Sequence, residues 1–408
     1  MNTSRKINTR LLTFQYCILQ GVYWAAFCAV YTFSTVLLLS KNFTSSQIGL
    51  TVGLGNIFAV ILQPVFAGIA DSTKRISLQK LTALLTVITG IFYALVYFLP
   101  NILWGIAACF LLSVTFLQVI QPLINSVSIY YINQGVPVDF GISRGIGSVS
   151  YAVVSSVLGY LTEYKGVNVI IPAGIFLLAI AVLVLLSMPL LKQNIGNTEG
   201  FVVQSSAQEK PVVKESLWHF FTRYRSFSIT LIAVTLLFTF HNMTNNYMIQ
   251  IVQSMGGDSS DMGTVFSIAA LCELPIMFIF SKLLKHFRSS RLLIISGIFF
   301  AIKSAAYLLA GNIFQFYLVQ ILQMGAFALY MPASIYYVNE TMSTSDKFKG
   351  QAVMTATNTL GGVIGSLLGG FLLDYAGITP MLITGFVMAT IGALLLWVSC
   401  KEQREGEI

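Results

Sequence analysis

Residues 168–190 read N-V-I-I-P-A-G-I-F-L-L-A-I-A-V-L-V-L-L-S-M-P-L and contain no charged side chain. A helix needs roughly 20 consecutive apolar residues to cross the hydrocarbon core of a membrane. This stretch is long and apolar enough to do so, and similar stretches recur along the whole chain. The sequence therefore predicts a protein built from membrane-spanning helices.

The composition of all 408 residues supports the same class. Apolar residues make up 56% and charged residues only 9%, whereas a soluble domain carries about 25% charged residues. With a mean hydropathy of +0.79, the chain has too few polar groups for a water-facing surface. A soluble enzyme, a disordered chain and a nucleic-acid binder are therefore disfavoured. The five cysteines form no C-x-x-C pair, so we expect neither a metal site nor a disulfide framework, and no cofactor.

We expect about twelve spans joined by short loops. The first six are expected at 11–39, 46–70, 78–98, 101–133, 141–164 and 168–190. The last six are expected at 226–255, 260–286, 290–310, 312–342, 348–376 and 378–400. The predicted fold class is an all-α polytopic membrane protein with twelve transmembrane helices in two pseudo-symmetric six-helix bundles.

The basic residues predict the orientation of these spans. Alternate connections and both chain ends carry clusters of Lys and Arg, namely 5–10, 74–80, 192–225, 282–291, 347–349 and 401–404. The opposite connections hold only Lys41 and Lys165. Cytoplasmic loops are enriched in Lys and Arg. We therefore expect a multi-pass protein of the cell membrane with both termini in the cytoplasm.

One longer polar stretch divides the chain into two halves. Residues 191–225 mix charges with Gly, Ser and Pro, so we expect an N-terminal bundle at 1–190, a cytoplasmic linker at 191–225 and a C-terminal bundle at 226–408. The halves share a weak repeat at an offset of 211, which pairs Ser155, Gly159 and Glu163 with Ser366, Gly370 and Asp374. Two parallel six-helix repeats are typical of secondary transporters.

Three motifs carry a resemblance to a known family. Span two ends in Q-P-V-F-A-G-I-A-D (63–71), span five opens with F-G-I-S-R-G-I-G (140–147), and span eight contains E-L-P-I-M-F (273–278). These motifs resemble the major facilitator superfamily, and within it the branch of lactose permease and the oligosaccharide/proton symporters. The resemblance implies a solute carrier whose site lies at the membrane midplane between its bundles.

Two ionisable residues lie deep in predicted spans, where each costs roughly 2.5–3.5 kcal/mol on insertion scales. Glu273 is the one carboxylate in such a position. Low dielectric disfavours its charged form, so it can hold and release a proton. Lys303 is the one mid-span lysine and is a candidate partner for Glu273 or for a substrate anion. We expect both residues to take part in proton coupling, as the resemblance also implies.

Arg144 and Tyr151 lie two helical turns apart on one face of span five. A guanidinium offers paired donors that suit neighbouring hydroxyls or a carboxylate. The resemblance assigns Arg144 to substrate hydroxyls and Tyr151 to stacking on a sugar ring. It also assigns Asp71, at the end of span two, to a gating contact between helices.

Uncharged polar residues form strips on several spans. Such strips suit a neutral, hydroxyl-rich substrate, although interhelical hydrogen bonding is an alternative for about half of them. The remaining candidate substrate ligands are Gln121, Asn125, Asn242, Asn245, Asn246, Gln323 and Asn358.

The chain departs from the branch at positions that the resemblance ties to galactosides and protons. Ser126 and Ile276 replace an acid and an amide, Gln323 and Ala326 replace a histidine and an acid, and the neutral pair Asn242 and Asn358 replaces a charged pair. These changes disfavour lactose itself. They leave Glu273 as the expected proton carrier if the protein is proton-coupled, and leave uniport open.

The leading hypothesis is a secondary active transporter that couples protons to uptake of a neutral polar solute, a saccharide or glycoside. The alternatives are proton-antiport efflux of drugs or metabolites and uptake of a nucleoside or aromatic acid. No nucleophile–base pair, metal cluster or phosphate loop indicates an enzyme. The expected partners are a small-molecule substrate, the proton and the lipid bilayer, with no nucleic acid, and the family implies a monomer.

Overall fold

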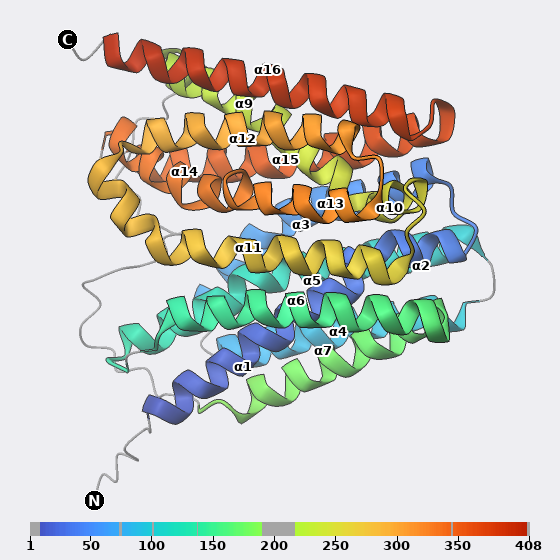
Figure 1. Cartoon of the computed structure of the whole chain (residues 1–408). Helices are drawn as coiled ribbons and strands as arrows, with labels where there is room; N and C mark the ends of the chain where they lie inside the picture. The colour runs from blue at the N-terminus through green and yellow to red at the C-terminus, as the bar shows by residue number, and fades with distance from the viewer. Residues whose placement is uncertain are drawn as a thin grey trace, which may run out of the picture. The chain divides into compact units, whose positions relative to one another are not determined.

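The computed structural model describes residues 9–72, 76–99, 102–136, 138–189, 217–343 and 346–405. Every regular element in these ranges is a helix, and the ranges contain no strand. Within the described ranges, twelve helical segments are long and apolar enough to cross a membrane. Figure 1 identifies the longer helices by label and colour. The predicted all-α class with twelve spans is confirmed.

In the described residues, the first half contains seven α-helices, a π-helical turn at Cys28–Thr32 and a 3₁₀ segment at Val167–Val169. The α-helices are α1 (Thr9–Phe27), α2 (Ser34–Ser40), α3 (Ser45–Ser72), α4 (Leu78–Phe98), α5 (Leu103–Asn133), α6 (Phe140–Lys165) and α7 (Ile170–Ser187). The first span, Thr9–Ser40, comprises α1, the π-helical turn and α2.

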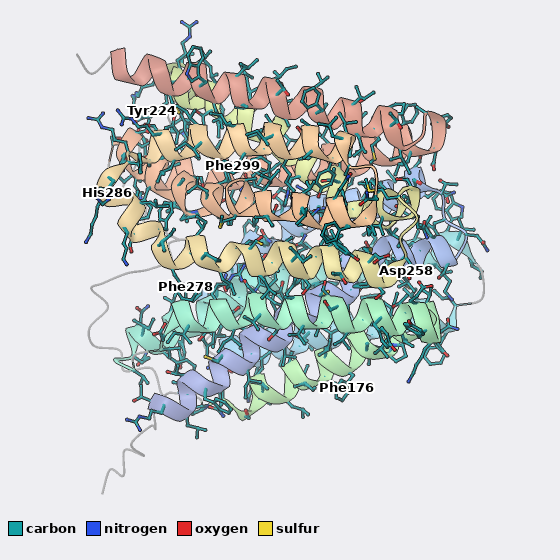
Figure 2. All side chains as sticks on the ribbon, viewed as in Figure 1. Phe176, Tyr224, Asp258, Phe278, His286 and Phe299 are labelled. Atoms are coloured by element: carbon teal, nitrogen blue, oxygen red, sulfur yellow. The ribbon has the colours of Figure 1, made fainter. Side chains whose placement is uncertain are left out.

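The second half contains nine α-helices and a 3₁₀ segment at Gln320–Met324. The α-helices are α8 (Leu217–Arg223), α9 (Arg225–Asn246), α10 (Met248–Ser254), α11 (Ser259–His286), α12 (Ser289–Leu309), α13 (Ile313–Val319), α14 (Phe327–Thr341), α15 (Lys347–Tyr375) and α16 (Ile378–Glu405). Figure 2 labels Asp258 and His286 at the two ends of α11.

Span seven ends earlier than the predicted range 226–255. Its helix α9 stops at Asn246, and α10 begins separately at Met248. Between them Tyr247 has a non-helical backbone (φ −109°, ψ 25°). Its hydroxyl lies 2.6 Å from the Ser366 carbonyl oxygen and 3.1 Å from that of Ser45. This pair of acceptors holds the buried tyrosine at the break between the two helices.

The chain forms two compact units. The first comprises Met1–Leu37 and Gly55–Ala207, and the second comprises Leu38–Leu54 and Gln208–Ile408. Inside the first unit, α1 packs on α6 and α7, and α4 packs on α5 and α7. Inside the second, α9 packs on α15 and α16, and α12 packs on α14 and α16. The three-part division at 190 and 225 stays a prediction, because residues 190–216 of the expected linker lie outside the described ranges.

Several helices expose large apolar side chains. Phe176 and Leu183 on α7 are 65% and 67% exposed, and Leu309 at the end of α12 is 81% exposed. Figure 2 labels Phe176 on α7. A soluble monomer rarely exposes large apolar patches, whereas lipid tails solvate such side chains without cost. The exposed apolar residues therefore suit a multi-pass membrane protein.

The start of α3 is held by α15 inside the second unit. Ser45 and Ser46 donate their backbone N–H groups to the two carboxylate oxygens of Asp374, at 2.9 and 2.7 Å. Thr44 donates its backbone N–H to Gln47 Oε1 at 3.0 Å, and Gln47 donates its backbone N–H to Thr44 Oγ1 at 3.3 Å. A helix start leaves four N–H groups without an intrahelical partner. All four of these groups therefore have an acceptor, two of them on a helix more than 300 residues away in sequence.

Two glycines allow this close approach of α3 to α15. A Cβ atom on Gly49 would lie 2.2 Å from the Ser366 carbonyl oxygen, and one on Gly370 would lie 2.3 Å from that of Ser45. Both obstacles are backbone atoms, which cannot rotate away as a side-chain tip can. The Gly370 position in the sequence repeat is therefore a packing position.

We expect Gly370→Ala to lower the stability of the second unit by about 1–3 kcal/mol, the usual range for an overpacked contact. The matched control is Gly68→Ala, because a Cβ atom at Gly68 meets nothing within 4 Å. Detergent-solubilised variants are compared by their unfolding midpoints. Equal midpoints for the two variants would contradict this account of the α3–α15 contact.

Candidate functional site

In the first unit, Arg144 on α6 contacts α1. Its Nη1 atom donates to Ser148 Oγ at 2.9 Å, and its Cζ atom lies over the ring of Trp24, 4.3 Å from the ring centroid. Ser148 follows Arg144 by one helical turn, so the bond stays on one face of α6. The contact with Trp24 is a cation–π interaction. Arg144 is thus positioned by its own helix and by an aromatic residue of α1.

Tyr151 contacts the π-helical turn that follows α1. Its hydroxyl lies 2.9 Å from Thr32 Oγ1, at the end of the π-helical turn. π-Helical turns inside helices are often found at functional sites. The structure thus places the two predicted ligands of span five, Arg144 and Tyr151, against the first span, Arg144 on α1 and Tyr151 on the π-helical turn.

Amides of α5 bond to residues of α1 and α3. Gln20 Nε2 donates to Asn125 Oδ1 at 3.0 Å, and Gln118 Nε2 donates to Asn56 Oδ1 at 2.9 Å. Asn56 in turn donates to the Tyr31 hydroxyl at 3.0 Å. The predicted ligand Gln121 is partly buried on α5, one turn before Asn125. These bonds gather polar groups of α1, α3 and α5 inside the first unit.

Sequence reasoning missed the contribution of α1. Gln20, Trp24, Phe27 and Tyr31 follow one another at steps of three and four residues, which places them on one face of the helix. Their contacts reach Asn125, Arg144 and Asn56. The available signal was an amide followed by aromatic residues at helical spacing, a pattern that ordinary helix packing produces as well.

In the second unit, Glu273, Gln323 and Lys303 form one hydrogen-bonded chain. Lys303 Nζ donates to Gln323 Oε1 at 2.6 Å, and Gln323 Nε2 donates to Glu273 Oε1 at 3.1 Å. The ammonium can only donate and an ionised carboxylate can only accept, so they fix the orientation of the amide between them. Lys303 is 2% exposed and Gln323 is 5% exposed. The three residues come from α11, α12 and the 3₁₀ segment.

The amides of α9 have different surroundings. Asn245 Nδ2 lies 3.1 Å from His241 Nε2, and the His241 ring stacks on Phe327 at 4.8 Å between centroids. Asn242 donates to the Phe238 carbonyl oxygen of its own helix at 2.9 Å. Asn246 is buried and donates to Ser366 Oγ of α15 at 2.6 Å. The bond of Asn246 therefore joins two helices.

The remaining predicted residues are placed as follows. Asn358 Oδ1 on α15 accepts a hydrogen bond from the Tyr330 hydroxyl of α14 at 2.8 Å. Asn242 bonds to Phe238 and Asn358 bonds to Tyr330, so these bonds go to different partners. Asp71 lies in the last turn of α3, and its side chain falls outside the described part of the chain. No cluster of three or more His, Cys, Asp and Glu residues that could hold a metal occurs among the described residues.

Comparisons with known proteins identify the family. The sequence model of the MFS_1 like family matches residues 14–383. An uncharacterised transporter of Bacillus subtilis (strain 168), YwbF, is 26% identical, over 96% of this chain and 95% of its own length. The maltose permease of Geobacillus stearothermophilus is 24% identical, over 93% of this chain and 92% of its own length.

Solved structures share the fold. The nucleoside transporter NupG aligns with a TM-score of 0.78 at 18% identity, over 95% of this chain and 98% of its own. The peptide transporter PepTSo aligns with a TM-score of 0.69 at 11% identity, over 97% of this chain and 98% of its own. The family match over most of the chain and the twelve-span fold lead to one conclusion: this chain belongs to the MFS_1 like family and is a multi-pass transporter of the major facilitator superfamily.

Proposed function

We propose that the protein couples proton entry to uptake of a neutral polar solute, a saccharide, by alternating access. The amide and hydroxyl groups gathered inside each unit support a hydroxyl-rich substrate, because such groups both donate and accept hydrogen bonds. The maltose permease relative supports the same class. The likeness to NupG concerns the fold alone, so a nucleoside remains an outcome of the test below.

The observation that carries the proposal is the Glu273–Gln323–Lys303 chain. With Glu273 ionised and Lys303 charged, the chain is neutral overall, which suits a low-dielectric position. Protonation of Glu273 leaves the charge of Lys303 uncompensated within the chain. The nearby cation therefore favours the ionised form of Glu273, and so favours release of its proton. In this proposal Glu273 carries the proton and Lys303 promotes its release.

The geometry also weighs against Lys303 as a ligand for a substrate anion. Its ammonium already donates to Gln323 at 2.6 Å and is nearly excluded from the surface. An anionic substrate would have to break that bond and replace Gln323. The coupling role therefore agrees better with the structure than uptake of an aromatic acid does.

The proposed substrate ligands follow from these contacts. In the first unit they are Arg144, Tyr151, Gln121 and Asn125. In the second unit they are Asn242, Asn245 and Asn358. Asn246 and Gln323 take other roles in the proposal, because the amide of Asn246 joins α9 to α15 and that of Gln323 joins Lys303 to Glu273.

We further propose that both termini are cytoplasmic in the cell membrane, as the basic clusters indicate. Green fluorescent protein fused to the C-terminus in a Gram-negative host should fluoresce, and alkaline phosphatase fused there should be inactive. Phosphatase inserted after Asn42, between the first two spans, should be active. The reverse pattern of phosphatase activity would contradict this orientation.

The test of coupling is the external pH of weakly buffered, de-energised cells that express the protein. Maltose, glucose, trehalose, lactose, uridine and an amphipathic drug are added one at a time. We expect alkalinisation with a saccharide, because inward symport removes protons from the medium. Glu273→Gln should abolish that signal and uphill uptake while it leaves sugar exchange intact, since an amide cannot carry the proton.

The matched control is Glu163→Gln, an exposed carboxylate at the end of α6, which should keep both activities. Uphill uptake that survives in Glu273→Gln would refute the assignment of Glu273. Acidification with the drug would favour efflux by antiport. Saccharide entry with no pH change would indicate uniport, and a response to uridine alone would favour a nucleoside.

The Gln323 amide joins Lys303 to Glu273. Gln323→Leu removes the acceptor of the buried Lys303 ammonium, and a buried donor left without its acceptor costs about 1–3 kcal/mol, and more when it is charged. Lys303→Met in the same chain should restore most of that stability, because no buried cation then remains at the site. Unfolding midpoints in detergent measure both effects. Gln253→Leu, at an exposed position of α10, is the control and should leave the midpoint unchanged. Additive losses in the double variant would show that Lys303 does not depend on Gln323.

A further inference from the structure

An aromatic strip runs along α1 and the π-helical turn that follows it, inside the first unit. Trp24, Phe27 and Tyr31 lie at successive steps of three and four residues. The Trp24 and Phe27 rings are 5.3 Å apart between centroids, and the Phe27 and Tyr31 rings stack at 4.9 Å. All three rings are partly exposed, whereas the adjacent Tyr23 and Ala25 are only 2% and 3% exposed. The strip is therefore a distinct face of α1 and the π-helical turn.

The neighbours of this strip are polar. Arg144 lies over the Trp24 ring, and Asn56 donates to the Tyr31 hydroxyl. Gln118 in turn donates to Asn56. A strip that faced lipid would have apolar neighbours, because hydrocarbon offers no partner for these groups. A partly exposed aromatic face with polar groups at both ends is instead typical of a binding site for a small polar molecule.

Helix α6 is shaped to receive the Trp24 side chain. A Cβ atom at Gly147 would lie 2.5 Å from Trp24 Cδ1, so only a glycine leaves room for the indole. Arg144 precedes Gly147 by one turn and Ser148 follows it directly. Ser148 holds the Arg144 guanidinium at 2.9 Å, against the indole ring. The indole and the guanidinium thus pack against each other, and Gly147, Arg144 and Ser148 of α6 provide the space and the contacts for this pair.

Tyr151 is engaged elsewhere. Its hydroxyl is 2.9 Å from Thr32, two turns along α6 from Arg144. Trp24, in contrast, touches the guanidinium itself. An indole offers a larger apolar face than a phenol ring, and the Trp24 side chain is already held in place by Arg144 and by the space at Gly147. Trp24 is therefore better placed than Tyr151 to support a ring whose hydroxyls reach Arg144.

We propose that Trp24 is the stacking surface for a saccharide ring and that Arg144, held against the indole, donates to hydroxyls of the same ring. This inference rests on the proposed saccharide uptake and assigns it a specificity-determining residue on α1. The guanidinium covers part of the indole, so the apolar C–H face of a pyranose packs on the part of the Trp24 side chain that stays exposed, while its hydroxyl edge suits the paired donors of the guanidinium. Phe27 and Tyr31 extend the aromatic surface along α1 for a second ring.

The test uses variants of the full-length protein and the saccharide that gives the largest pH response among maltose, glucose, trehalose and lactose. Trp24→Ala should raise the half-saturation concentration for exchange about tenfold, which corresponds to about 1.4 kcal/mol. Trp24→Phe should recover most of the affinity, because it restores an aromatic face. Tyr151→Phe should change affinity less than Trp24→Ala does, because it keeps the ring and removes only the hydroxyl.

Trp104→Phe is the matched control, because Trp104 is 81% exposed on α5 and far along the chain from the strip. A second readout is independent of transport. A chain in which Trp104, Trp218 and Trp397 are replaced by Phe retains Trp24 as its one tryptophan. Its fluorescence should change saturably with the saccharide, and Arg144→Lys should weaken that response.

The outcomes separate this inference from the proposed function. Saccharide uptake with unchanged affinity in Trp24→Ala and no fluorescence response would overturn the role of Trp24 and leave the function standing. A lower unfolding midpoint with unchanged affinity would assign Trp24 to packing and also overturn it. If the wild-type protein transports none of the saccharides, the proposed function and this inference are overturned together. A response of Trp24 to uridine and to no sugar would overturn the saccharide assignment.

Discussion

The structure depends on one constraint: polar groups inside a membrane must find partners within the protein, because hydrocarbon supplies none. Lys303 is the clearest case. It is 2% exposed, and its ammonium donates a hydrogen bond to Gln323. Gln323 in turn donates to Glu273. One amide thus joins a buried cation to a partly buried carboxylate. The same arrangement keeps a protonatable carboxylate close to a cation, as the proposed proton coupling requires.

The constraint also governs helix ends and close contacts. The first turn of α3 has two N–H groups that its own residues do not satisfy, and Asp374 of α15 accepts both. Glycines at Gly49 and Gly370 bring the two helices close enough for this contact. Small residues at helix contacts and polar side chains between helices are general features of membrane proteins. Here they join elements more than 300 residues apart in the sequence.

The amides inside the spans illustrate why a polar strip is ambiguous in a sequence. Asn245 and Asn246 are adjacent, yet Asn245 lies beside His241 while Asn246 is buried against Ser366. An amide that binds solute and an amide that joins helices have the same composition and spacing. The direction of each side chain depends on the neighbouring helix, so packing alone separates the proposed ligands from the helix–helix bonds.

The fold class and the twelve spans can be predicted from consecutive residues alone, because hydropathy is a local property. Glu273, Lys303 and Arg144 can be found in the same way, since a charge within an apolar span is visible without any partner. What each of them touches depends on how the helices pack. Gln323 lies 50 residues from Glu273, and Trp24 lies 120 residues from Arg144. Aromatic residues at helical spacing look alike whether they pack or bind, so the role proposed for Trp24 rests on the contact between α1 and α6.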